Sequence, residues 1–271
     1  MAKLFYIGGF GRSGSTLLEY LLTSDPSVVA CGEVARHVNK FRTRRACTCG
    51  RPAPACSIWG PFQFGFNGAG CLDHKALTLA MLIKISPRFA AMVDSSKTAW
   101  GSAFMPFRLR RSLGRDFLLV HLVRDPRAVC WSTIRTLVKV KKGKRSASPR
   151  SRCLQTAIGW TAANLACEIF GVVHPKNYLR VRYEDLMLAP RQVIDEVFSR
   201  LALQSPPALE RAGTGDNRHQ LYGNAVRFGR SSLSTLKEDV SWKSAMPKAY
   251  RGLAAFTWPL AAKYGYFRSP A

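Results

Sequence analysis

The sequence predicts an α/β protein in which a parallel β-sheet lies between two layers of helices, a three-layer α/β/α fold. Two observations predict it. Short runs of apolar and β-branched residues recur along the chain, and stretches with a helical spacing of apolar side chains follow them. Strands that alternate with helices form parallel sheets covered on both faces, because each crossover helix packs on one face.

The first strand is expected at Leu4–Phe10 (LFYIGGF), an apolar run that ends in glycines. A helix follows from Ser15, since the leucines of LLEYLL repeat at helical spacing, and it ends before Asp25-Pro26. Further buried strands are predicted at Phe89–Val93, Phe117–Val123 and Tyr178–Arg182.

The chain is interpreted as one domain, residues 1–271, because no convincing linker divides it. Residues 43–75 are rich in Gly, Pro, Cys and aromatic residues, so an irregular insertion beside the site is expected there. Residues 139–152 carry seven basic residues and no acidic one, which predicts a solvated, mobile loop. Residues 203–232 are expected to form a polar loop.

Composition narrows the protein class. Hydrophobic residues make up 47% of the 271, which excludes a disordered or collagen-like protein. The 41 Lys and Arg against 16 Asp and Glu give a net charge of +25, so an anionic partner is expected. Eight cysteines without a secretory leader predict reduced thiols and a cytoplasmic location. No continuous apolar run approaches the roughly 18–20 residues of a spanning helix, so no transmembrane segment is expected.

A glycine loop, GGFGRSGST, follows the first expected strand. Gly9 and Gly14 have the spacing of the phosphate-binding loop G-x-x-x-x-G-K-[ST], and Ser15 and Thr16 follow, which predicts a P-loop-type sheet. Backbone N–H groups and the positive end of the next helix would face a bound anion. The lysine of that motif is missing, which argues against ATP or GTP as a phosphoryl donor. Arg12 supplies a cation from a different position.

Three motifs in this order resemble the sulfotransferases that use 3′-phosphoadenosine 5′-phosphosulfate, PAPS, as donor. They are RSGST at 12–16, VRDPRAVCWS at 123–132 and VRYEDL at 181–186. In motif style the chain is most similar to carbohydrate, tyrosylprotein and bacterial sulfotransferases. The resemblance implies that PAPS is the co-substrate and adenosine 3′,5′-bisphosphate the product. The residues expected to hold the 5′-phosphosulfate are Gly11, Arg12, Ser13, Gly14, Ser15 and Thr16.

The second motif suits the 3′-phosphate of the donor. Arg124 follows the strand 117–123 and can offer a guanidinium fork to a phosphate, while Ser132, about two helical turns later, can add a hydroxyl. As an alternative, Arg124 and Asp125 form a local ion pair and Ser132 is a plain helix position. Tyr183 of the third motif fits the core or, by the resemblance, a place beside the nucleotide.

Sulfuryl transfer requires a base for the acceptor proton and cations for the charge on the leaving phosphate. We expect Glu33, after the apolar Val28–Ala30 segment, to be the base. The sequence Cys-Gly-Glu around it is similar to tyrosylprotein and some carbohydrate sulfotransferases, in which the matching glutamate has this role. Lys97 matches the position where relatives place a lysine that neutralises the bridging oxygen of the donor, a task that Arg12 would share.

Each of these assignments has an alternative. Glu33 could be a surface glutamate paired with Arg36 or Arg42, and Lys97 could be an exposed loop lysine. His37, one helical turn beyond Glu33, could replace it as the base or orient it.

The pattern H-x-x-x-G-N-x-x-R begins at His219 and resembles a late loop of bacterial and carbohydrate sulfotransferases that closes on the donor. The resemblance implies that Gly223 allows a close backbone approach, that Asn224 belongs to the same contact, and that Arg227 binds a phosphate. A plain surface loop with a capping asparagine is the alternative.

One cysteine-rich stretch could hold zinc through Cys47, Cys49, Cys56 and either Cys71 or His74. The spacing C-x-C-x6-C lacks the paired C-x2-C units of common structural zinc sites, so free or redox-active thiols are favoured. The transfer chemistry itself needs no metal, because the arginine and lysine of the site supply positive charge.

The sequence therefore predicts a PAPS-dependent sulfotransferase that acts on an acceptor hydroxyl, with a sugar or glycoconjugate favoured. Basic clusters at Arg36–Arg51, Arg108–Arg115 and Lys139–Arg152 are expected to surround the entrance, which suits an acidic glycan or a lipid-linked acceptor at an anionic surface. A P-loop kinase using ATP and Mg²⁺ is weakened by the missing lysine. A nucleic-acid-binding protein is weakened because residues 139–152 contain no aromatic side chain for base stacking, and no specific nucleic acid is expected.

Overall fold

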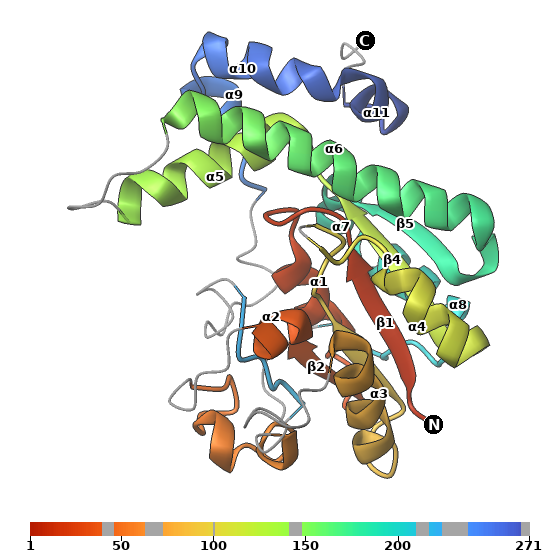
Figure 1. The fold of residues 1–271 in the computed structure, drawn as a ribbon. Coiled ribbons are helices and arrows are strands. Elements are labelled where there is room, and N and C mark those ends of the chain that lie inside the picture. Colours follow the sequence, from red (N-terminus) through yellow and green to blue (C-terminus); the bar gives the residue numbers. More distant parts are fainter. Residues whose placement is uncertain are drawn as a thin grey trace.

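A single parallel sheet of five strands organises the protein (Figure 1). The computed structural model describes residues 1–39, 46–62, 73–99, 101–140, 148–209, 217–223 and 238–266. The strands are β1 (Lys3–Gly8), β2 (Val28–Gly32), β3 (Ala91–Asp94), β4 (Phe117–Val123) and β5 (Tyr178–Arg182). Their order across the sheet is β2-β3-β1-β4-β5, with Lys3 opposite Ala91 and Leu4 opposite Phe117.

The predicted strands are confirmed with small changes at their ends. β4 and β5 have the predicted bounds, because both are uninterrupted apolar or alternating runs bounded by polar residues. β1 ends at Gly8, two residues earlier than expected, since the following glycines turn the chain into the loop. β3 begins two residues later, at Ala91, and extends to Asp94.

Helices cover both faces of the sheet, so the three-layer α/β/α architecture is confirmed. One face packs against α1 (Ser15–Leu22), α7 (Tyr183–Leu188) and α8 (Pro190–Arg200). The other face packs against α3 (His74–Ile85), α4 (Met105–Leu113) and α6 (Pro149–Val173). Leucines of α1 at helical spacing, such as Leu18 and Leu21, are fully buried, and each contributes about 2 kcal/mol of hydrophobic stabilisation.

A further group of helices lies beyond the carboxyl ends of the strands (Figure 1). It includes α6, which also packs on one face of the sheet. The members of the group are α5 (Pro126–Val140), α6, α9 (Trp242–Ala245), α10 (Lys248–Ala254) and α11 (Trp258–Lys263). Among the described helices, α6 alone is long and apolar enough to cross a membrane by length and composition, although its sequence holds no uninterrupted apolar run of that length. It packs against α5, α10 and β4, and 44% of its most apolar window is buried inside the protein.

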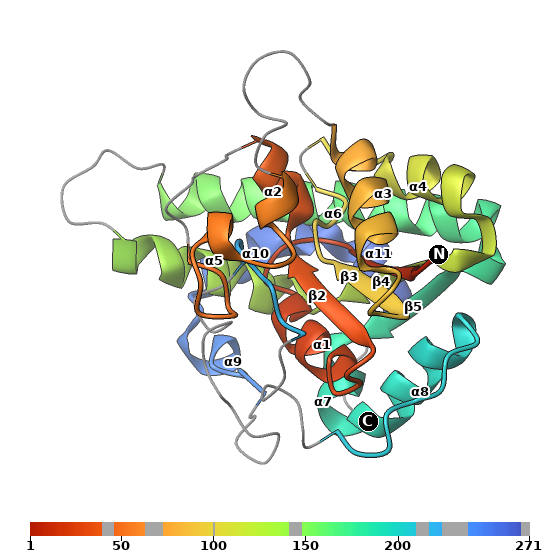
Figure 2. The same ribbon diagram turned by 90° about the horizontal axis from the view of Figure 1, so that it is seen from below.

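The open side of β2 carries the least regular part of the described chain, which we call the edge region: residues 46–62 and 217–223. The first segment contains two short 3₁₀ turns, η1 (Ala53–Ala55) and η2 (Gly60–Phe62), and an isolated antiparallel bridge between Ala46 and Pro52, so it is irregular as its composition predicted. The second runs beside β2, where Ala30 and Arg218 form a parallel bridge (Figure 2). Helix α2 (Val34–Asn39) follows β2 directly. Further 3₁₀ turns are η4 (Gly114–Asp116), η5 (Pro175–Asn177) and η8 (Ala255–Thr257).

Candidate active site

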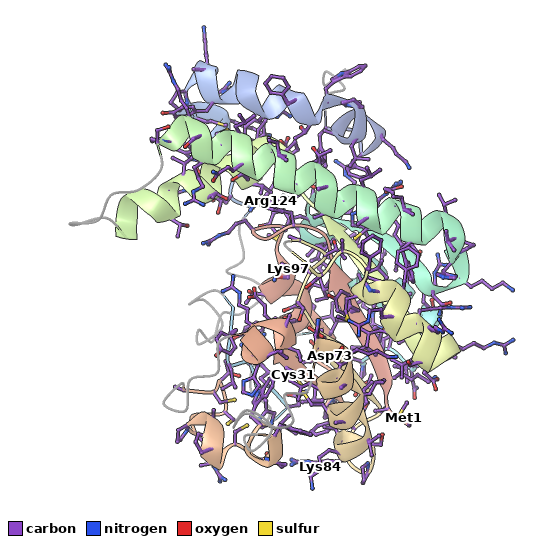
Figure 3. All side chains as sticks on the ribbon, in the orientation of Figure 1. Met1, Cys31, Asp73, Lys84, Lys97 and Arg124 are labelled. Carbon is purple, nitrogen blue, oxygen red and sulfur yellow. The ribbon has the colours of Figure 1, made fainter. Side chains whose placement is uncertain are left out.

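The order of the strands indicates where a ligand binds. The chain leaves β1 towards one face, through α1, and leaves β3 towards the other, through α4. In open parallel sheets, ligands bind outside the carboxyl ends of strands where the connections diverge in this way. The glycine loop of residues 9–14 lies at this end of β1. Figure 3 shows Lys97 and Arg124 at the same end of the molecule, and Met1 at the other.

Two glycines give the loop its path. Gly9 and Gly14 have φ angles of 99° and 97°, which side-chain-bearing residues rarely adopt. A Cβ atom on Gly9 would lie 2.5 Å from the carbonyl oxygen of Leu122, and one on Gly14 would lie 2.5 Å from the ring of Tyr183. The loop is therefore pressed against β4 and α7, and Tyr183 packs directly on it.

Ser13 offers the loop a hydroxyl group that could bind an anion. Its side chain is buried, with 2% of the residue exposed, and its hydroxyl oxygen has no hydrogen-bond partner among the described residues. An unsatisfied buried hydroxyl costs roughly 1–3 kcal/mol, so its presence calls for an explanation such as a ligand. A phosphate or sulfate oxygen would satisfy it. Ser15 and Thr16 begin α1, where the helix dipole favours the same negative charge.

Arg124 lies against the glycine loop. Its guanidinium donates to the carbonyl oxygens of Arg12 (3.3 Å) and Asp239 (3.0 Å), and its Cζ lies 4.3 Å from the centre of the Tyr183 ring. The alternative ion pair with Asp125 is wrong, because that carboxylate binds Arg127 at 2.7 Å. The structure thus brings Arg12, Arg124 and Tyr183 together.

Ser132 lies two turns into α5, half-buried. Its carbonyl oxygen accepts a hydrogen bond from the hydroxyl of Thr136 at 2.9 Å, as in an ordinary helix. Its part in binding a 3′-phosphate therefore stays a prediction.

Glu33 and Lys97 form an ion pair that is largely buried. The ammonium of Lys97 donates to Glu33 Oε1 at 2.8 Å and to the carbonyl oxygen of Ser95 at 2.8 Å, and each side chain of the pair is 12% exposed. Lys97 is therefore not an exposed loop lysine. Arg36 binds the second carboxylate oxygen of Glu33, so the predicted pairing with Arg36 also forms. Glu33 follows β2 and Lys97 follows β3, and these strands are neighbours in the sheet.

The charges around Glu33 keep it ionised. Burial raises the pKa of Glu33, but the Lys97 ammonium and the Arg36 guanidinium outweigh burial and hold this pKa below its ordinary value. Arg12 lies in the same electrostatic environment, where burial and the nearby Arg36 lower its pKa. The arginine stays charged, since its unperturbed pKa lies above 12. The site thus combines one carboxylate with several cations.

Both predicted site cations adopt an unusual backbone conformation. Arg12 and Lys97 have φ angles of 69° and 68°, and with Ala202 they are the non-glycine residues of the described chain with positive φ. Such conformations persist where the surroundings enforce them, and they are common at functional sites. At Lys97 the hydroxyl of Tyr6 donates to its carbonyl oxygen at 2.6 Å, and its own N–H donates to the carbonyl oxygen of Ile7.

Comparison with known proteins agrees with this geometry. Residues 114–207 match the model of the sulfotransferase family. The matched segment covers less than half of the chain. It contains the Arg124 and Tyr183 motifs and leaves the glycine loop outside the match. No curated protein matches the sequence.

Solved sulfotransferases share the fold of the whole chain. A sulfotransferase domain from the curacin biosynthetic pathway is 19% identical with a TM-score of 0.61, and the alignment covers 99% of each chain. A sulfotransferase of Alicyclobacillus acidocaldarius is 16% identical over 100% of this chain and 97% of its own, with a TM-score of 0.53. The sulfotransferase domain of the Synechococcus PCC 7002 olefin synthase is 17% identical over 100% and 96%, with a TM-score of 0.52.

Glu19 is a buried acidic residue near this candidate site that none of the sequence motifs indicated. It lies in α1, 2% exposed, and accepts a hydrogen bond from the side chain of Gln220 in the edge region. Burial raises its pKa to about 8, so the carboxyl group is largely protonated at neutral pH. Its position within the apolar run LLEYLL was the available signal, because a charged residue inside a core-facing helix needs a specific partner.

The histidines are not placed as the sequence suggested. His37 is 1% exposed, its ring lies 4.5 Å from that of Trp59, and burial lowers its pKa to about 4, so it packs as a neutral core residue. We therefore do not assign it as a base. His74 binds Asp94 at 2.8 Å through Nε2, which removes it from the proposed zinc ligands. His219 is 3% exposed and contacts Cys56.

The late-loop assignment is only partly within the described structure. Gly223 has a φ of 141° and follows Tyr222, whose carbonyl oxygen would lie 2.8 Å from a Cβ on Gly32. This segment therefore passes close to the end of β2, one residue before Glu33. Asn224, Arg227, Cys71 and residues 141–147 of the basic loop lie outside the described residues, so their assignments stay predictions. The predicted loop bounds 139–152 are too wide, because α5 extends to Val140 and α6 begins at Pro149.

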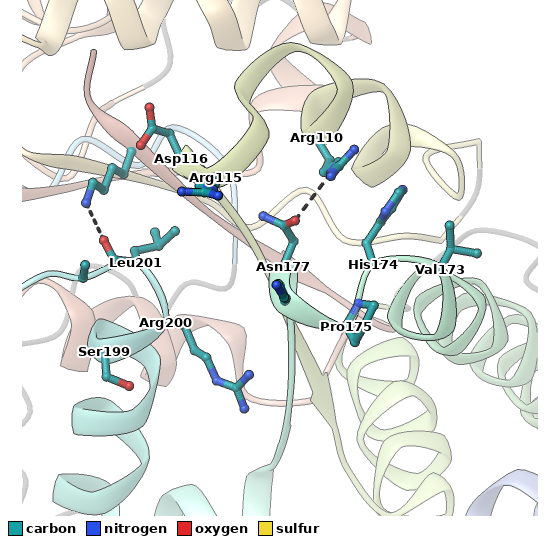
Figure 4. Close-up of a pocket in the computed structure, with 13 residues that line it drawn as sticks. Arg110, Arg115, Asp116, Val173, His174, Pro175, Asn177, Ser199, Arg200 and Leu201 are labelled. Atoms are coloured by element: carbon teal, nitrogen blue, oxygen red, sulfur yellow. Dashed lines mark hydrogen bonds between the residues drawn. The ribbon is translucent and has the colours of Figure 1, made fainter.

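A basic hollow lies at the opposite end of the sheet (Figure 4). Four basic residues line it: Lys3 at the start of β1, Arg110 in α4, Arg115 just before β4, and Arg200 at the end of α8. The cluster at Arg108–Arg115 was expected at the entrance of the active site. This expectation is wrong for Arg110 and Arg115, because α4 runs from the carboxyl end of the sheet back to its amino end.

Proposed function

We propose that the protein is a sulfotransferase that moves a sulfuryl group from PAPS to an acceptor hydroxyl. One observation carries the proposal: three neighbouring strands deliver Arg12, Lys97 and Glu33 to one end of the sheet, where the last two are in contact. This provides two cations and one carboxylate beside a phosphate-binding loop. Sulfuryl transfer needs that set of groups.

The donor fits the residues that surround the loop. The Ser13 hydroxyl has no hydrogen-bond partner among the described residues and suits an oxygen of the 5′-phosphosulfate. Arg124 currently donates to two carbonyl oxygens, which a 3′-phosphate would outcompete, since hydrogen bonds between charged groups are about twice as strong as neutral ones. Tyr183, which packs between Arg124 and Gly14, would lie beside the nucleotide.

In the reaction, the acceptor oxygen attacks the sulfur in line with the bond that breaks, the one between sulfur and the bridging phosphate oxygen. The acceptor proton moves to Glu33. The electron pair of the broken bond stays on the leaving adenosine 3′,5′-bisphosphate, where Lys97 and Arg12 stabilise its charge. No step in this sequence requires a metal.

The ion pair with Lys97 would keep Glu33 a weak base until the donor binds. While Lys97 binds Glu33, the carboxylate is a weak base, because its pKa is held low. A bound phosphosulfate would compete for the Lys97 ammonium, which lies 2.8 Å from the carboxylate. Withdrawal of that charge raises the pKa of Glu33 towards the value that suits a general base.

For the acceptor we propose a carbohydrate or glycoconjugate, and the net charge of +25 favours one that is already acidic or held at an anionic surface. Two of the structural neighbours come from the curacin pathway and from an olefin synthase. A screen should therefore include hydroxyl acceptors that are not sugars. We also propose a cytoplasmic location, because the seven described cysteines are all free thiols.

A thermal-shift experiment tests donor binding. Adenosine 3′,5′-bisphosphate without metal should raise the melting temperature, by the equivalent of about 2.7 kcal/mol at a hundredfold excess over its Kd. Arg124→Ala should reduce this shift more than the shift given by adenosine 5′-phosphate, which lacks the 3′-phosphate. Equal losses would refute the Arg124 assignment. If ATP with Mg²⁺ stabilises the protein and adenosine 3′,5′-bisphosphate does not, a kinase is favoured. In that case a screen of hydroxyl acceptors with ³⁵S-labelled PAPS should give no labelled product.

A further inference from the structure

Three cysteines and one histidine meet in the edge region. Cys47, Cys49 and Cys56 come from its first segment and His219 from its second, 163 residues beyond Cys56. Their sulfur and nitrogen atoms all lie within 4.8 Å of one another. Cys47, Cys56 and His219 are each at most 3% exposed, and Cys49 is half-buried. The cluster takes no part in the proposed transfer.

The distances between these atoms suit four ligands of one metal ion. Cys47 Sγ and Cys56 Sγ are 3.7 Å apart, and Cys56 Sγ is 3.2 Å from His219 Nδ1. Two thiolates bound to zinc at about 2.3 Å in a tetrahedron lie about 3.8 Å apart, whereas disulfide-bonded sulfurs lie about 2.05 Å apart. The sulfur positions therefore correspond to the edge of a coordination tetrahedron.

The backbone holds the ligands in place without a metal. Gly50 has a φ of 84° and donates to the carbonyl oxygen of Cys47, which forms a tight turn around Cys49. Cys47 also donates to the carbonyl oxygen of Arg51 at 2.8 Å. The turn brings the first two cysteines to the same side as the third.

The histidine is fixed from both sides. The backbone N–H of His219 donates to the carbonyl oxygen of Ala30 in β2 at 2.8 Å, and its own carbonyl oxygen accepts from the indole of Trp59. Thr48, between the first two cysteines, donates to the carbonyl oxygen of Arg218 and accepts from the N–H of Gln220. The two segments are thus already in register before any ion binds.

We propose that Cys47, Cys49, Cys56 and His219 bind one Zn²⁺ ion. Three thiolates and one imidazole form a recurrent set of structural zinc ligands, and soft thiolates favour zinc over magnesium or calcium. Four protein ligands leave no position for water or substrate, so the ion is structural. It ties residues 46–62 to the strand-like segment 217–223 and so supports the side of β2 that leads to Glu33.

Metal analysis of the purified full-length chain tests the site. We expect about one zinc per chain after desalting, and replacement by Co²⁺ should give the intense visible absorption of a tetrahedral thiolate site. Cys56→Ser and His219→Ala should each lose the bound metal. Cys153→Ser, a matched change of a buried cysteine on α6, should keep it.

If the ligand variants do not fold, zinc binding is tested on the wild-type protein. A strong chelator should then remove the zinc and lower the melting temperature, and added zinc should restore both. Wild-type protein that contains no metal and gives no cobalt spectrum would overturn the proposal. A mass two hydrogens lighter, assigned to a Cys47–Cys56 disulfide, would overturn it as well. Neither result depends on PAPS, so the proposed transferase function is tested separately.

Discussion

The donor side of the sheet and the edge region are built in different ways. On the donor side, the loop after β1, Arg124 after β4 and Tyr183 after β5 each follow a strand directly, so the parallel sheet alone gathers them. In the edge region, Cys56 and His219 are 163 residues apart, and little regular structure lies around them. Regular architecture assembles the first site, whereas specific hydrogen bonds and the proposed metal assemble the second.

The largest effect is expected at Glu33, which lies where the two regions meet. Glu33→Gln should lower kcat by about 10²–10⁴-fold, because the amide does not accept the acceptor proton, while donor affinity changes little. Turnover with labelled PAPS and calorimetric titration with adenosine 3′,5′-bisphosphate measure the two quantities. A near-normal kcat would show that Glu33 is not the base of the reaction.

A pair of alanine substitutions tests how tightly the donor side is packed. Gly14→Ala should destabilise the protein by roughly 2–3 kcal/mol, because its φ is positive and the new Cβ would lie 2.5 Å from the Tyr183 ring. Gly11→Ala is the control, since its Cβ would have no atom within 4 Å. Urea unfolding of both variants measures the difference, and equal stabilities would mean that the loop is not pressed against Tyr183.

A pH-dependent effect concerns Glu19, which joins the two regions through Gln220. Its folded pKa of about 8 lies above the ordinary value of 4.5, so its contribution to stability is complete below pH 4.5 and is lost as pH rises towards 8. The free energy of unfolding should therefore fall between pH 5 and pH 8, by at most about 1.4 kcal/mol per pH unit.

Glu19→Gln should remove this slope, because an amide has the shape of the carboxyl group and does not ionise in this range. Urea unfolding of wild type and variant at several pH values gives the comparison. Parallel pH profiles would show that Glu19 does not gain its proton on folding.

The sequence predicted the parts of the molecule that depend on short-range patterns. Phe117–Val123 and Tyr178–Arg182 were predicted at their observed bounds, because the pattern of apolar residues within each segment is enough to indicate a buried strand. The contact between Glu33 and Lys97 was not predictable, since it depends on the order of the strands. Neither were the left-handed conformations of Arg12 and Lys97, which the surrounding hydrogen bonds enforce.

For His219, the motif resemblance suggested a role that its contacts in the structure do not support. A motif resemblance assigned it to the donor loop, yet its side chain lies beside a cysteine in the edge region. The sequence suggested a zinc set that included His74, but the histidine that lies beside the cysteines belongs to a distant segment. Spacing rules for metal sites apply to ligands that are close in sequence, and this cluster draws one ligand from far along the chain.

Segment 217–223 also affects how this protein behaves towards other copies of itself. β2 is the outermost strand, and an uncovered outer strand presents N–H and C=O groups that pair with foreign chains. Ala30 donates to the carbonyl oxygen of Asn217 and accepts from the N–H of His219, so both of its polar groups are occupied. If this segment detaches, β2 becomes a template for intermolecular pairing, and the first sign of damage would be aggregation rather than unfolding.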